Sequence, residues 1–173
     1  MFNITEPGFS VETIDDGVNN QTVSLSSKFI GESNLDVQTI VGISHPSPVR
    51  EYITGGSPPL VPNLDQPTST DNNNEPYLLY YEYLLPRPNY DLPQVISNSY
   101  GDDEQTVPLK YAQRVCNMIG MVGLRGISVL ESSGDSASVG GTSSIVPESS
   151  WEFGSSGFSN YLPRPSYQEA AVH

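Results

Sequence analysis

The stretch "QVISNSYGDDEQTVPLKYAQRVCNMIGMVGLRGISVLESSGD" (residues 94–135) decides the fold class. It opens with a β-rich segment that ends at Gly101, and it closes with a second one, "ISVLESSGD" (127–135). Between them, apolar residues recur at helical spacing from Val107 to Leu124, and Gly126 follows. A strand, a helix and a strand over about 40 residues form a βαβ crossover, which requires parallel strands. The stretch therefore predicts an α/β protein with a mostly parallel sheet flanked by helices.

The rest of the chain fits around this unit as one domain, residues 1–173. "FSVETI" (9–14) alternates as a short strand does, residues 32–44 predict a short helix, and "YLLYYEYLL" (77–85) suits a buried helix. Residues 54–76 are so rich in Gly, Pro, Asn, Asp and Ser that they predict a surface loop. The acidic run 102–104 suits the N-terminus of the helix that follows it.

Charge and composition exclude several classes of partner. Seven basic and twenty acidic residues give a net charge of -13, which argues against nucleic acid and against anionic membranes. No apolar stretch approaches the ~20 residues of a membrane span, and "MFNITEPGFS" has no signal-peptide pattern. A single cysteine, Cys116, excludes an internal disulfide and a zinc cluster. Two histidines provide too few ligands for a histidine-based metal site.

Two glycosylation sequons occur, at Asn3 and at Asn20. Sequons also arise by chance, so the sequence alone leaves open whether either asparagine carries a glycan. If they do, the chain passes through the secretory route.

Three acidic residues are candidates for chemistry. Glu32 and Asp36 stand four positions apart, so a helix would place them on one face with Cβ atoms about 5–6 Å apart. Close carboxyl groups titrate together and one pKa rises, which suits a general base with a supporting acid. The alternative is a solvated helix face. Asp135 follows an apolar strand, where active groups of parallel sheets gather; the alternative is a turn former.

Four segments, in this order, resemble the sedolisin family of serine-carboxyl peptidases, most closely its fungal tripeptidyl-peptidases. They are "GESNLDVQTIVG", "PQVISNSYGDDEQTVPLKYAQRVCN", "GLRGISVLESSGDS" and "SSGFSNYLPRPSYQEAAV". The resemblance extends from Phe9 to Val172. It implies a partial subtilisin-like fold, cleavage of peptide or protein substrates at acidic pH, and an extracellular location.

The resemblance also assigns roles to residues. Glu32 would be the general base, Asp36 its supporting acid, and Asp135 the acid at the oxyanion. Ser99, Tyr100 and Gly101 match the strand whose backbone pairs with substrate. The family binds calcium near its C-terminus, in a segment beyond these residues, so we expect no metal or other cofactor in this chain.

Two departures from the family change the expected activity. The family's nucleophilic serine lies in a later S-G-T-S motif, which "VGGTSS" (139–144) imitates at the place of a different strand. Measured against the family's pattern, we also expect an internal deletion near residues 136–139. We therefore expect a truncated copy that is inactive by itself. Two alternatives remain open: a non-catalytic remnant that binds peptide or protein, and a truncated gene product without function.

Overall fold

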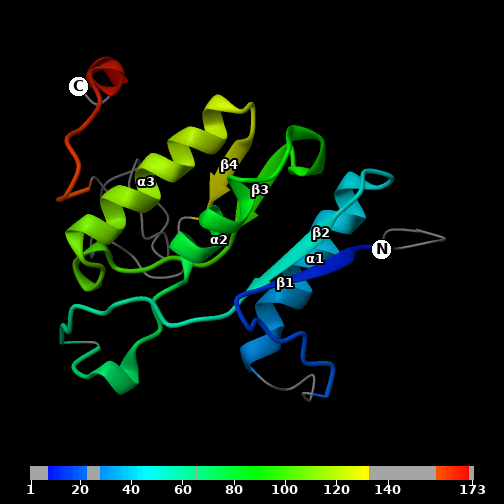
Figure 1. Cartoon of the computed structure of the whole chain (residues 1–173), viewed down its shortest axis with the longest axis horizontal. Helices are drawn as coiled ribbons and strands as arrows, with labels where there is room; N and C mark the ends of the chain where they lie inside the picture. The colour runs from blue at the N-terminus through cyan, green and yellow to red at the C-terminus, as the bar shows by residue number, and fades with distance from the viewer. Residues whose placement is uncertain (1–7, 23–27, 65, 133–158, 172–173) are drawn as a thin grey trace, which may run out of the picture. The chain divides into compact units, whose positions relative to one another are not determined.

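The computed structural model describes residues 8–22, 28–64, 66–132 and 159–171. Within these ranges it contains helices and short parallel strands (Figure 1). The chain divides into two compact units, residues 1–56 and residues 57–173, and each is described by itself. Helices combined with parallel strand pairs agree with the α/β class that the sequence predicts.

The first unit is a strand, a helix and a strand. β1 (Ser10–Ile14) precedes α1 (Lys28–Ser44), and β2 (Arg50–Thr54) lies parallel to β1. The predicted strand and helix are confirmed, although the helix begins four residues before Glu32. The sequence does not predict β2, because "REYIT" mixes charged and apolar residues and its strand conformation depends on pairing with β1.

The turn after β1 and the end of β2 approach each other closely. A Cβ at Gly17 would lie 2.1 Å from the Ile53 carbonyl oxygen, and one at Gly55 would lie 2.3 Å from that of Asp15. Only glycine permits such backbone contact. Asp15 and Asp16 themselves adopt left-handed conformations, with φ of 46° and 62°. The turn after β1 is therefore held tightly against the end of β2.

The second unit contains the crossover on which the fold class was predicted. It consists of α2 (Tyr77–Leu84), β3 (Val95–Asn98), α3 (Leu109–Leu124) and β4 (Ser128–Glu131). β3 and β4 are parallel, with Val95 opposite Ser128 and Asn98 opposite Glu131. The predicted βαβ arrangement is confirmed. Short 3-10 turns connect the elements at Ser69–Asp71, Asn89–Asp91, Glu104–Thr106 and Ser166–Ala171.

The acidic run before α3 does not cap that helix, contrary to the sequence prediction. α3 begins after Pro108, and Glu104–Thr106 forms a separate 3-10 turn. Proline fixes an extended conformation on the residue before it, so the helix cannot extend back to the acids. The carboxylates bind elsewhere: Asp102 accepts from the Glu75 backbone N–H, and Glu104 accepts from the Asn160 N–H at 2.6 Å.

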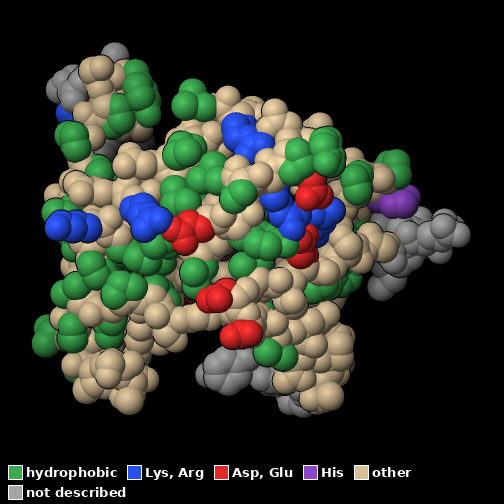
Figure 2. All heavy atoms as spheres, viewed as in Figure 1, with side chains coloured by type: hydrophobic (Ala, Val, Ile, Leu, Met, Phe, Trp, Pro, Cys, Tyr) green, Lys and Arg blue, Asp and Glu red, His purple; other side chains and the backbone are tan. Residues whose placement is uncertain are grey.

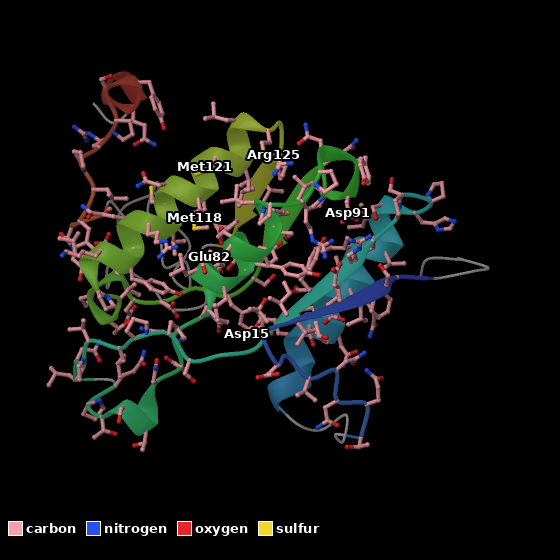
Figure 3. The ribbon with its side chains drawn as sticks, in the orientation of Figure 1. Asp15, Glu82, Asp91, Met118, Met121 and Arg125 are labelled. Atoms are coloured by element: carbon pink, nitrogen blue, oxygen red, sulfur yellow. The ribbon has the colours of Figure 1, made fainter. Side chains whose placement is uncertain are left out.

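The core of this unit lies between α2, α3 and the strand pair. Its buried apolar side chains are Tyr80, Tyr81, Leu84, Ile96, Met118, Val122 and Ile127. On α3, Met118 is 9% exposed whereas Met121 is 51% exposed, and the two point in different directions in Figure 3. Spacing by four residues places Met118 and Val122 on the inward face, as the helical periodicity predicts.

Arg125 fastens the end of α3 to the segment after α2 (Figure 3). Its guanidinium donates to the carbonyl oxygens of Leu85 at 2.7 Å and Arg87 at 2.5 Å, and to the side chain of Asn89. A single cation thus satisfies the carbonyl at the C-cap of α2 and a second carbonyl in the segment that follows.

Thr54, the first residue of the predicted loop, ends β2, and the described residues between 55 and 76 contain one 3-10 turn and otherwise irregular backbone. Their attachment to the rest of the second unit is polar: Asn74 donates to the Thr106 carbonyl at 3.0 Å, and the Thr106 hydroxyl donates to Asn74 at 2.9 Å. Both side chains are buried. The segment is therefore anchored at its end, directly before α2.

Many apolar side chains remain exposed in the described residues. Leu64, Tyr90 and Leu124 are 99%, 92% and 91% exposed, and Figure 2 shows hydrophobic side chains scattered over the face in view. The described strands form two separate two-stranded sheets, one in each unit. A single subtilisin-like sheet that would contain both pairs stays a prediction.

Candidate functional site

The first candidate group lies on α1. Glu32 and Asp36 occupy one helix, four residues apart, and both side chains are partly exposed. The predicted i,i+4 placement on one helix is thus present in the structure. α1 starts at Lys28, so Glu32 lies in its second turn, and the alternative of a solvated helix face stays open because both side chains are partly exposed.

A third carboxylate joins this group from β2, and the sequence did not point to it. The pKa of Glu51 is raised above 4.5, first because burial removes water from the carboxylate and second because Asp36 carries like charge nearby. Arg50 and Tyr52 alternate with Glu51 along the strand, and Arg50 pairs with Glu12 at 2.9 Å on the other face. Glu51 therefore lies on the face of β2 that is turned toward Asp36, and the Arg50 guanidinium lies on the opposite face.

The second candidate group surrounds the carboxyl end of the β3–β4 pair. Asn98 and Glu131 end the two strands opposite each other, and the Asn98 amide donates to the Glu131 carboxylate at 2.6 Å. The same amide lies 3.3 Å from the Tyr81 hydroxyl. Ligand sites of parallel sheets gather at this end of the strands.

Titratable groups here lose part of their hydration, which shifts their pKa values. Desolvation raises the pKa of Glu131, and the hydrogen bonds from Asn98 and Tyr77 oppose that rise. Burial likewise raises the pKa of Tyr77, and it raises the pKa of Tyr81 to about 12, so both phenols stay protonated. The pKa of Asp102 is raised by burial and lowered by the Glu75 N–H.

The predicted substrate segment, Ser99 to Gly101, follows β3 directly. The strand itself ends at Asn98, three residues earlier than the sequence indicated. The Tyr100 carbonyl accepts a hydrogen bond from the Tyr77 hydroxyl, which also contacts Glu131. The sequence did not single out Tyr77 or Glu131, because only the folded chain brings them beside Tyr100.

The structure brings the predicted residues together in two groups and no further. Glu32 and Asp36 belong to the first unit, and Ser99 to Gly101 belong to the second. Asp135 and the suspected deletion near 136–139 lie outside the described residues. Across the described ranges, no three His, Cys, Asp or Glu residues form a metal-binding cluster, and the expectation of no metal stays a prediction. No helix in those ranges is both long and apolar enough to span a membrane.

Comparison with known proteins gives the chain its relatives. It is 56% identical to tripeptidyl-peptidase sed4 of Aspergillus fumigatus over 200 residues, which include 99% of this chain and 33% of the relative. It is 39% identical to tripeptidyl-peptidase SED2 and 40% identical to tripeptidyl-peptidase SED4 of Arthroderma otae, with 95% of the chain aligned to each. No family model and no solved structure matches the chain.

The alignments also show how much of each relative the chain matches. The chain spans about a third of the length of these relatives. The first alignment is 200 positions long and the chain has 173 residues, so the relative has residues in that stretch that this chain lacks.

Proposed function

The chain is a homologue of the fungal tripeptidyl-peptidases of the sedolisin family, and from this premise we propose that it carries the general-base and substrate-binding part of an acid-acting serine-type peptidase. Glu32 takes the proton of the nucleophile, Asp36 supports it, and Asp135 donates to the oxyanion. An extended peptide pairs with Ser99 to Gly101. The placement of Glu32 and Asp36 on one helix is the observation that supports these roles most directly.

Acidic pH suits this arrangement. Asp36 stands close enough to Glu51 to raise its pKa, so at neutral pH the two charges repel each other. Protonation of Glu51 in acid removes that repulsion. An oxyanion acid must likewise be protonated to donate a hydrogen bond. An extracellular location, peptide or protein substrates and a subtilisin-like fold belong to the same proposal.

We assign no nucleophile within residues 1–173, so the 173-residue chain expressed by itself should bind peptide without cleaving it. Sustained, acid-dependent release of tripeptides by this chain, abolished by Glu32→Gln, would show that a nucleophile is present after all. Peptide binding without turnover also fits the second candidate, a non-catalytic remnant. The shorter sequence within the alignment favours that candidate.

A chimera separates the two candidates. The matching third of the Aspergillus fumigatus relative would be replaced by residues 1–173, and tripeptide release would be measured between about pH 3 and pH 7. If this segment retains its catalytic groups, the chimera is active in acid, and Glu32→Gln lowers kcat by about 10²–10⁴-fold or more. Glu12→Gln on β1 is the matched control and should leave kcat unchanged. A folded but inactive chimera would support the non-catalytic remnant instead.

A further inference from the structure

The backbone of β3 has a defined direction toward β4. Ser128 donates its N–H to the Gln94 carbonyl at 3.0 Å, and Ser132 donates to the Asn98 carbonyl at 2.9 Å. Successive residues of a strand turn their backbone N–H and C=O groups to opposite edges, so every second residue faces the same edge. The even-numbered residues of this strand therefore direct their N–H and C=O groups toward β4.

β3 ends at Asn98, and we infer that its alternation extends through the next three residues. Tyr100 is even-numbered, and the Tyr77 hydroxyl binds its carbonyl. The backbone groups of Ser99 and Gly101 then point to the edge that faces away from β4. An added peptide strand would pair with those groups, because each strand binds its neighbour through alternate residues.

Tyr77 is held firmly in this position. It is the first residue of α2, and its ring stacks on that of Tyr81 at 6.3 Å with an interplanar angle of 17°. Its hydroxyl also contacts Glu131, which Asn98 orients from the neighbouring strand; the single phenolic proton can go to the Tyr100 carbonyl when a protonated Glu131 donates to the phenol oxygen in turn. A phenol fixed by its ring and its hydroxyl can restrain the carbonyl that it binds.

Gly101 leaves open space beside this edge. A Cβ at Gly101 would find no atom within 4 Å, and the residue is not among the glycines with positive φ. Neither packing nor backbone conformation therefore requires glycine at this position. Side chains of a strand point out of the plane of the sheet, so the open space beside Gly101 can receive a side chain of a peptide paired at this edge.

We propose that Tyr77 is a positioning residue for substrate: it holds the Tyr100 carbonyl toward β4, so that Ser99 and Gly101 present their backbone to an extended peptide. This inference rests on the proposed peptide binding at residues 99–101. It adds a residue from α2 that acts through Tyr100 without touching the peptide. It also assigns the open space beside Gly101 to a side chain of that peptide.

Tyr77→Phe removes one hydroxyl and keeps the aromatic ring. Affinity for a fluorescently labelled extended hexapeptide would be measured at acidic pH by anisotropy on the 173-residue chain. Loss of one hydrogen bond that orders the edge should raise Kd about 2- to 10-fold. Tyr83→Phe is the matched control on the same helix, because the Tyr83 hydroxyl and ring contact Arg87 instead. That variant should bind as the parent does.

The carbonyl carbon of Tyr100 provides a readout that does not need the peptide. In Tyr77→Phe, its NMR chemical shift should move because the carbonyl loses a hydrogen bond, while the shifts of α3 stay unchanged. A merely structural role in the packing of α2 would instead move shifts across both helices. An unchanged Tyr100 carbonyl shift would overturn the positioning role, whether or not the parent chain binds peptide.

Gly101→Ala tests the approach of the peptide. The new methyl has room in the free protein, so thermal stability should hold, whereas saturable peptide binding should be lost. Gly120→Ala on α3 is the matched control, since a Cβ there also meets nothing within 4 Å. Failure of the parent chain to bind peptide would refute the proposed binding function. Equal binding by the parent, Tyr77→Phe and Gly101→Ala would refute this inference alone.

Discussion

The amide of Asn98 donates a 2.6 Å hydrogen bond to the carboxylate of Glu131, and these two residues end adjacent parallel strands in register. The contact joins β3, which leads into the predicted substrate segment, to β4, which leads toward Asp135. A neutral amide satisfies the carboxylate without adding a cation. Glu131 is consequently a partly desolvated acid with a raised pKa at the end of the sheet where ligands bind.

Glu131→Gln should change how stability depends on pH. The folded-state pKa of Glu131 is raised above 4.5, so the folded state holds its proton more tightly than the unfolded state does. Its contribution to stability is complete below about pH 4.5 and is lost as pH rises through the raised pKa. The difference in unfolding free energy between parent and variant, from urea titrations between about pH 4 and pH 7, should therefore shift with pH. A constant difference would contradict the assignment.

Asp36→Asn should lower the pKa of Glu51 without returning it to 4.5. Burial is the larger cause of the raised value and remains, whereas the like charge of Asp36 is removed. Carboxyl carbon shifts from an NMR titration would measure this directly. Glu12→Gln on the opposite face of β1 is the control and should move the pKa of Glu51 less. An unchanged Glu51 titration in Asp36→Asn would mean that the two carboxylates do not interact.

Leu84→Ala should destabilise the second unit by about 2–5 kcal/mol. Leu84 is fully buried at 0% exposure, so truncation leaves a cavity between α2 and its neighbours. Leu124→Ala is the control, because Leu124 is 91% exposed and its truncation should change stability by less than about 0.5 kcal/mol. Urea unfolding followed by circular dichroism would give both values. Equal losses would mean that Leu84 does not lie in the core.

Asn20 should carry a glycan when the chain is made in a eukaryotic secretory pathway. Asn20 is exposed, and its side-chain oxygen accepts hydrogen bonds from the Thr22 hydroxyl at 2.7 Å and the Thr22 N–H at 3.0 Å. This turn presents the amide nitrogen of the sequon outward. Peptide mass spectrometry would find the modification in the parent and in Thr22→Ser, and would find Asn20 bare in Thr22→Ala. A bare Asn20 in the secreted parent would contradict the prediction.

The sequence predicts the parts of the fold in which periodicity is strong. The spacing of Met118 and Val122 identifies α3, and the apolar runs on either side require parallel strands. β2 escapes prediction because its register with β1 decides its conformation. The start of α3 is misjudged because Pro108 outweighs the acidic residues before it.

Local sequence is less informative about the candidate site. Glu32 and Asp36 are separated by one helical turn, so a motif can identify them. Tyr77 and Glu131 are far apart in the chain, and they meet only because α2 packs beside the end of the strand pair. The alternation that turns Ser99 and Gly101 away from β4 likewise depends on which strand β3 pairs with.

The bonds of Ser132 and Asn160 have a consequence for substitutions in the segment that they share. Ser132 is bound to Asn98, and Asn160 is bound to Glu104, so two residues far apart in the sequence are attached to one short segment, residues 98–104. The same segment contains the residues proposed to pair with substrate. A substitution that displaces it should therefore disturb both attachments and the proposed binding edge at once.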